Sequence, residues 1–194
     1  PLYSSAASDV YKRQAYKWPI LCFIAVGFWN IVGAGLLGFT LNTPIALYYM
    51  QGMNMTAAHG HAALFGVYGM LGIGLLLFCL RGLSNRTAWS DKLVGLTFWS
   101  LNVGLAMMVF MSLVPAGIYQ AWASLSEGVW FARSPGFVHS AWMETFVWLR
   151  VPGDIVFAVG TLLLALFAVR LLIVRRDPDP AAIGSADALA GKTI

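Results

Sequence analysis

The stretch that decides the fold covers residues 57–80 and reads AAHGHAALFGVYGMLGIGLLLFCL. It contains no Asp, Glu, Lys or Arg. A helix rises about 1.5 Å per residue, so about 20 apolar residues cross the ~30 Å hydrocarbon core of a bilayer. Residues 57–80 are therefore predicted to form a membrane-spanning helix. On either side of them, three more stretches are long and apolar enough to span, over residues 18–40, 93–114 and 154–174.

The composition of the whole chain agrees with a membrane protein. Of its 194 residues, 59% are hydrophobic and 10% are charged, against about 25% charged in ordinary soluble domains. Backbone polar groups in hydrocarbon must be satisfied inside the protein, and the sequence has no period-two alternation typical of a membrane barrel. The fold class is therefore predicted to be all-α integral membrane, with four transmembrane helices.

Basic residues lie mostly on one side of these four predicted helices. Lys and Arg concentrate in cytoplasmic loops, so their distribution predicts the orientation of a membrane protein. Of the 12 Lys and Arg, only Arg133 and Arg150 fall on the other side, between the third and fourth helices. Both ends of the chain are expected to be cytoplasmic. The protein is expected to be a multi-pass protein of a bacterial inner membrane, in contact with membrane lipid. The same rule explains the net charge of +4, so no nucleic-acid partner is inferred.

The ends of the chain differ in composition from its apolar middle. Residues 1–14, PLYSSAASDVYKRQ, lack the apolar run of a signal peptide and are expected to be a non-native or unstructured leader. Residues 15–176 are predicted to form the membrane domain, and residues 177–194 a disordered cytoplasmic tail. The tryptophan-rich residues 116–149 are expected to lie as an interfacial segment on the outer side.

Two histidines lie near the outer end of the predicted helix over residues 57–80. His59 and His61 are two positions apart, about 200° around a helix axis, so their imidazoles point to nearly opposite sides. They cannot readily chelate one metal ion, but they can serve two metal centres on the two flanks of the helix. The many small residues nearby leave room for a broad plate such as a porphyrin, although small residues also serve close helix packing.

The role of these histidines stays open on spacing alone. Ionisable side chains in membrane helices are rare and usually functional. Metal ligation by His59 and His61 is favoured over hydrogen bonding in a packed bundle or a proton path. The metal is not decided at this point, because imidazole suits haem iron, copper and zinc. As haem ligands, both rings would have their second nitrogen held by a hydrogen-bond acceptor.

Arg150 and Asp154 are four residues apart at the start of the fourth predicted helix. The simplest interpretation is a carboxylate near a helix N-terminus with a local ion pair. The other interpretation is a quinol site, because an acidic group at membrane depth is suited to taking protons from a bound quinol.

Several motifs in the same order resemble a known family. They read MNMTAAHGHAALFGVYGMLG over residues 53–72, FWSLN over 98–102, QAWAS over 120–124 and WLRVPGD over 148–154. Together they resemble the quinol-dependent nitric oxide reductases, a branch of the haem-copper oxidase superfamily. The resemblance implies that the histidine helix is the tenth core helix, and that this chain is the last third of a twelve-helix bundle.

The resemblance also implies an activity and cofactors. The parent protein would reduce two nitric oxide molecules to nitrous oxide and water with electrons from quinol, using two b-type haems and a non-haem iron. His59 would bind the iron of the high-spin haem, and His61 the iron of the low-spin haem. Arg150 and Asp154 would lie at the outer mouth of the final helix, on the side of the haems, as a quinol site.

The chain departs from the family pattern by what it lacks. The family needs a further haem histidine, three histidines for the non-haem iron and glutamates beside it, whereas His139, Glu127 and Glu144 fall in the outer segment. The remaining ligands are expected on the missing N-terminal helices of the same subunit, so this chain alone is not expected to turn over nitric oxide. Two rivals remain: an oxygen-reducing oxidase of the same superfamily, and a non-catalytic membrane haem protein or transporter.

Overall fold

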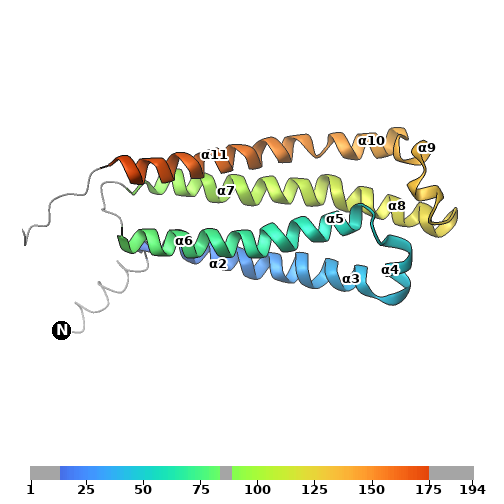
Figure 1. The fold of residues 1–194 in the computed structure, drawn as a ribbon, viewed down its shortest axis with the longest axis horizontal. Helices are drawn as coiled ribbons and strands as arrows, with labels where there is room; N and C mark the ends of the chain where they lie inside the picture. The colour runs from blue at the N-terminus through green and yellow to red at the C-terminus, as the bar shows by residue number, and fades with distance from the viewer. Residues whose placement is uncertain (1–13, 84–88, 175–194) are drawn as a thin grey trace, which may run out of the picture.

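A computed structural model of the chain describes residues 14–83 and 89–174. These residues form helices and turns and contain no strand. They include four long helices that run side by side (Figure 1), each long and apolar enough to cross a membrane. These four spans are Lys17–Asn42, Asn54–Leu83, Asp91–Ser126 and Ala141–Ile173. The predicted all-helical fold with four transmembrane helices is confirmed.

The expected terminal segments fall largely outside this description. Of the leader expected over residues 1–14, only Gln14 belongs to the described residues, and the tail expected over residues 177–194 lies outside them entirely. Both expectations remain predictions.

Each of the first three spans is built from successive helical elements with a π-helical stretch in the middle. The first span consists of α2 (Lys17–Trp29), η1 (Asn30–Leu37) and α3 (Gly38–Asn42), and is followed by the short α4 (Pro44–Met50). The second consists of α5 (Asn54–Gly60), η2 (His61–Gly69) and α6 (Met70–Leu83). The third consists of α7 (Asp91–Met107), η3 (Met108–Leu113) and α8 (Val114–Ser126). The three η stretches are π-helical, with hydrogen bonds from residue i to residue i+5.

The third and fourth spans extend further than the sequence predicted. α8 carries the third span on to Ser126, and α10 (Ala141–Trp148) leads directly into α11 (Val151–Ile173). The prediction of an interfacial segment over residues 116–149 is therefore wrong in extent. The connection between α8 and α10 is formed only by η4 (Phe131–Arg133), α9 (Pro135–Val138) and short turns. Pro115 does not end the third span, since the wider turns of η3 come immediately before it and relieve the crowding of its ring.

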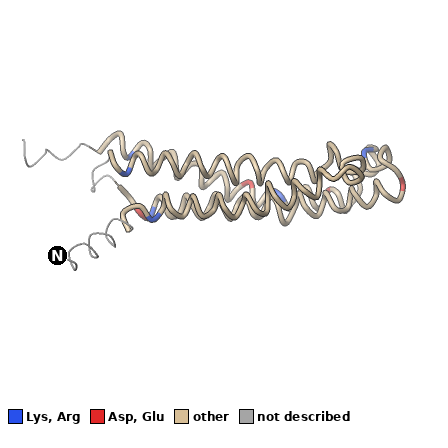
Figure 2. The backbone as a smooth tube through the Cα atoms, turned by 90° about the horizontal axis from the view of Figure 1, so that it is seen from below, with Lys and Arg blue, Asp and Glu red and all other residues tan. Residues whose placement is uncertain are grey.

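The spans are longer than the hydrocarbon layer they cross. The 36 residues of the third span extend roughly 54 Å, compared with ~30 Å of hydrocarbon. Figure 2 shows charged residues gathered mainly at the two ends of the bundle and sparse along its length. We call the end that carries Lys17, Arg81 and Lys92 the basic end, and the end formed by η4 and α9 the distal end.

α7 and α11 make the most extensive helix contact in the described bundle. A Cβ on Gly104 would lie 2.6 Å from the backbone nitrogen of Phe157, and one on Gly153 would lie 2.8 Å from the backbone nitrogen of Met108. Small residues are typical of helix interfaces in membranes because they let two backbones approach. This close contact fixes the position of the last span against the third.

Trp29 joins the first three spans at the centre of the bundle. Its side chain is buried, and its Nε1 donates a hydrogen bond to Asn102 Oδ1 at 3.0 Å. Its ring lies against Gly66, where a Cβ would be 2.5 Å from Trp29 Cγ. The indole therefore fills the space that Gly66 leaves in the second span and is held there by the third span.

The π-helical stretches of the first two spans lie side by side, close to the start of the second span. η1 contacts η2, and α5 contacts both η1 and η3. Short π-helical stretches inside α-helices are rare and occur often at functional sites. In the described chain they gather around the part of the second span that carries the two histidines.

Candidate functional site

The histidine helix is held at its start by another span. Gln120 Oε1 accepts hydrogen bonds from the backbone nitrogen of Asn54 at 2.9 Å and from its side-chain Nδ2 at 2.7 Å. Gln120 Nε2 in turn donates to the carbonyl oxygen of Ala132 at 3.3 Å. The first backbone N–H groups of a helix have no partner within it, so a buried amide from α8 both satisfies one of them and positions α5.

His59 is held by the first span. Its Nδ1 lies 2.9 Å from the carbonyl oxygen of Gly33, inside η1. Because a carbonyl oxygen only accepts, this contact places the proton on Nδ1 and leaves the lone pair on Nε2. The ring also packs against Gly38, where a Cβ would lie 2.9 Å from His59 Cε1. The first span thus sets both the tautomer and the orientation of His59.

His61 is turned toward the last span. Its Nδ1 lies 2.8 Å from the carbonyl oxygen of Ala57, one turn earlier on the same helix. Its Nε2 lies 3.0 Å from a terminal guanidinium nitrogen of Arg150, which can only donate. Nε2 is therefore the acceptor, and His61 has the same tautomer as His59, with the proton on Nδ1.

The two imidazoles therefore lie on different flanks of one helix, as their spacing predicted. His59 lies against η1 and α3 of the first span, and His61 lies against Arg150 at the start of α11. In each ring a backbone carbonyl holds Nδ1–H, which is usual for a histidine that ligates a metal, and Nε2 carries the lone pair; in His61 that lone pair accepts from Arg150. Groups of three or more His, Cys, Asp and Glu suited to holding an ion are absent from the described residues.

Arg150 connects His61 to Asp154. Its Nε donates to Asp154 Oδ1 at 3.2 Å, which is the local ion pair that the spacing predicted. Both side chains are partly exposed, at 36% and 46%, so the pair itself adds at most about 0.5 kcal/mol to stability. Its effect is on geometry, because Asp154 holds the guanidinium that contacts His61 Nε2.

The remaining polar residues considered from the sequence lie away from this cluster. His139 Nδ1 is 3.7 Å from Glu144 Oε1, and both side chains are largely exposed. Glu144 lies on α10, in line with the last span, whereas the sequence placed it in a loop. Glu127 follows α8 at the distal end and is exposed.

Sequence reasoning did not find Gly33, Gly38 or Gln120 as partners of the histidine helix. Their contacts join residues 26 to 66 positions apart, or rest on the space beside a glycine. The matched motif over residues 120–124 contained Gln120 without indicating its role. The link between Arg150 and His61, 89 positions apart, was likewise invisible to spacing.

Comparison with known proteins assigns this membrane bundle to a family. The family described as "Cytochrome C and Quinol oxidase polypeptide I" matches residues 8–156, which include His59, His61, Arg150 and Asp154. The chain belongs to this family. Over 134 residues it is also 30% identical to a nitric oxide reductase polypeptide of Stutzerimonas stutzeri, a match that covers 66% of this chain and 28% of that protein. The chain therefore spans little more than a quarter of the length of this relative.

Membership of the cytochrome c and quinol oxidase family agrees with the multi-pass helical bundle and implies haem cofactors. The histidine cluster fits such a cofactor. Haem iron takes an imidazole nitrogen as its axial ligand. His59 keeps Nε2 for that purpose, and His61 Nε2 carries the same lone pair but accepts a hydrogen bond from Arg150 in this structure. The partly exposed surface of the second span beside them includes Gly60 and Ala63, whose small size leaves room for a flat ring.

Proposed function

We propose that this chain is the C-terminal part of a membrane nitric oxide reductase whose parent uses electrons from quinol. The overall reaction joins two nitric oxide molecules, two electrons and two protons into nitrous oxide and water. The observation that carries the proposal is the pair His59 and His61, with their carbonyl-held Nδ1 atoms and their separate flanks. The likeness to the nitric oxide reductase polypeptide of Stutzerimonas stutzeri supports the choice of substrate.

In this proposal the two histidines serve two b-type haems. His59 Nε2 binds the iron of the high-spin haem, and His61 Nε2 binds the iron of the low-spin haem. Bound haem supplies one-electron transfer and a site for nitric oxide. A non-haem iron completes the site and is held by residues outside this chain, on the N-terminal helices of the same subunit.

The residues of this chain have defined tasks toward that cofactor. The carbonyl oxygens of Gly33 and Ala57 hold Nδ1–H and aim Nε2 of each ring. Arg150 contacts both His61 Nε2 and Asp154, and it would have to leave His61 Nε2 before that nitrogen could hold iron. The guanidinium would then keep its ion pair with Asp154. Gly38 leaves the space that His59 needs to keep its orientation.

The proposed setting is a bacterial inner membrane with the basic end in the cytoplasm. Lys17, Arg81 and Lys92 lie at that end, consistent with the enrichment of basic residues on the cytoplasmic side. The histidines and Asp154 then lie toward the outer side, where quinol would deliver electrons.

The proposal is tested on the full-length parent. A pyridine haemochrome assay is expected to give two b-type haems per protein, and anaerobic turnover with a reduced quinol is expected to yield one nitrous oxide for every two nitric oxide molecules consumed. A protein that consumes oxygen but forms no nitrous oxide would instead be an oxygen-reducing oxidase. A parent without haem would contradict both the nitric oxide reductase and the oxygen-reducing oxidase, and would favour a transporter.

Asp154→Asn in the parent tests the quinol site. If Asp154 accepts a proton from bound quinol, turnover with quinol should fall about a hundredfold, the lower end for loss of a general base. Turnover with an artificial donor that reduces the haem directly should be unchanged. Glu144→Gln, an exposed carboxylate on α10, is the matched control and should leave both rates unchanged. Equal loss with both donors, together with loss of haem, would show that Asp154 only positions Arg150.

A further inference from the structure

An apolar groove of about 370 Å³ lies between α2 and α7. Its rim includes Ile24 and Phe28 from α2, and Trp99 and Val103 from α7, all of them exposed. Its inner part ends at Trp29 and Asn102, which are joined by a hydrogen bond. Because Trp29 lies against Gly66, the indole separates the groove from the histidine helix.

A second, more open hollow lies at the basic end of the same two helices. It is lined by Trp18, Asp91, Lys92, Gly95 and Leu96. Gly95 makes room for Trp18, since a Cβ there would be 2.6 Å from Trp18 Cζ2. The rings of Trp18 and Phe98 lie 6.0 Å apart, and Phe98 also lines the apolar groove. The two hollows therefore follow one line along α2 and α7.

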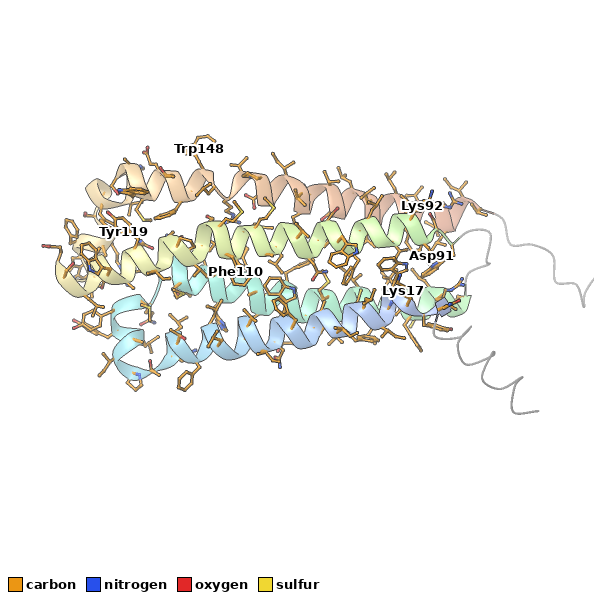
Figure 3. The ribbon with its side chains drawn as sticks, turned by 180° about the vertical axis from the view of Figure 1, so that it is seen from behind. Lys17, Asp91, Lys92, Phe110, Tyr119 and Trp148 are labelled. Atoms are coloured by element: carbon orange, nitrogen blue, oxygen red, sulfur yellow. The ribbon has the colours of Figure 1, made fainter. Side chains whose placement is uncertain are left out.

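The basic end of this line carries ammonium groups next to indoles. Lys17 Nζ lies 4.9 Å from the centre of the Trp18 ring, and Lys92 is exposed beside the open hollow. Asp91 Oδ1 accepts hydrogen bonds from Trp18 Nε1 and Trp89 Nε1, each at 3.1 Å. Figure 3 shows Lys17, Asp91 and Lys92 together at this end of α2 and α7.

We propose that the apolar groove and the open hollow together bind one anionic phospholipid from the leaflet at the basic end. Its phosphate lies between Lys17 and Lys92, and one acyl chain lies in the apolar groove with its end toward Trp29. Basic residues at the membrane surface attract anionic headgroups. Residues 21–29 of α2 rise about 12 Å, close to the ~15 Å depth of hydrocarbon in one leaflet. The proposal does not depend on the haem assignment.

The rim of the groove favours an acyl chain over another helix. Helix contacts in this bundle use small residues, such as Gly104 and Gly153 between α7 and α11. The groove is instead bordered by large side chains, which keep a second backbone at a distance and leave a narrow channel between them. A flexible hydrocarbon chain fills such a channel, whereas a helix would rest on its rim.

Native mass spectrometry of the purified full chain tests the headgroup site. With equal amounts of phosphatidylglycerol and phosphatidylcholine carrying the same acyl chains, the wild-type chain should retain one phosphatidylglycerol in preference. Lys17→Gln and Lys92→Gln should each lower the ratio of retained phosphatidylglycerol to phosphatidylcholine about fivefold, which corresponds to ~1 kcal/mol per basic residue. Arg133→Gln, at the distal end, is the charge-matched control and should leave the ratio unchanged. An unchanged ratio in both lysine variants would overturn the proposal.

The acyl site is tested separately. Val103→Trp fills the groove and should lower retention of both lipids at least about fivefold, whereas Leu75→Trp on the exposed side of α6 should not. Phosphatidylglycerol with a photoreactive acyl chain should label residues 96–106 of the unaltered chain, so the test does not depend on folding of a variant. Labelling spread over all exposed faces, or displacement by an isoprenoid quinone but not by unlabelled phosphatidylglycerol, would overturn the proposal. If the full-length parent were not labelled at these residues, the groove would be covered by another part of the protein there, and the proposal would be overturned.

Discussion

His61→Ala in the full-length parent is expected to remove the low-spin haem spectrum, whereas His59→Ala is expected to keep it and lose the high-spin signal. The reason is geometric, because the two rings lie against different spans and keep their Nε2 atoms on different flanks. Nitric oxide turnover should fall at least about a hundredfold in both variants, since loss of a ligand costs more than the 10- to 100-fold typical of an outer-shell partner. Optical and paramagnetic resonance spectra of the purified variants separate the two outcomes.

His139→Ala is the control for this pair, since His139 is exposed at the distal end beside Glu144. It should leave both spectra and turnover unchanged. If either variant of the pair lost both haems while remaining folded by circular dichroism, separate ligand roles for His59 and His61 would be excluded.

Gly104→Leu is expected to destabilise the chain. A side chain at this position would meet the backbone of Phe157 at 2.6 Å, and backbone cannot move aside as a flexible side chain can. Overpacking of this kind typically costs about 1–3 kcal/mol. For a chain of this size the apparent melting temperature in detergent should fall by roughly 2–12 °C.

Gly72→Leu is the matched control for Gly104→Leu. Gly72 lies on the exposed side of α6, and a Cβ added there would have no atom within 4 Å, so a leucine meets open space. Its melting temperature should fall by no more than about 2 °C, since leucine is also the better helix former. Equal losses in both variants would show that the added apolar bulk in detergent, and not the α7–α11 approach, causes the loss of stability.

Apolar length was enough to predict the four spans but not their ends. The hydrocarbon core sets a minimum length for a helix, which residues 57–80 meet by composition alone. It sets no maximum, so the continuation of the third span through Pro115 to Ser126 depends on the π-helical turns of η3 before the proline. The hydrophobic period of the sequence gives no sign of those turns.

The candidate site was predictable in its local part only. Helix geometry alone placed His59 and His61 on opposite flanks and paired Arg150 with Asp154. Apart from the carbonyl oxygen of Ala57 on the same helix, the partners that orient the rings come from other spans, through the carbonyl oxygen of Gly33 and the guanidinium of Arg150. Such contacts depend on how helices are rotated against one another, and a single sequence carries no direct record of that rotation.

The π-helical stretch η2 makes the histidines sensitive to insertions and deletions. Its i→i+5 bonds each enclose one more residue than the i→i+4 bonds of the α-helix on either side, and the stretch lies between the histidines and α6. Removing one residue from His61–Gly69 while its i→i+5 bonding pattern is kept would rotate α5 by roughly a quarter turn relative to α6. His59 would then leave the space beside Gly38, and His61 would leave Arg150, with every side chain still present. The number of residues in this stretch is therefore as much a part of the site as their chemistry.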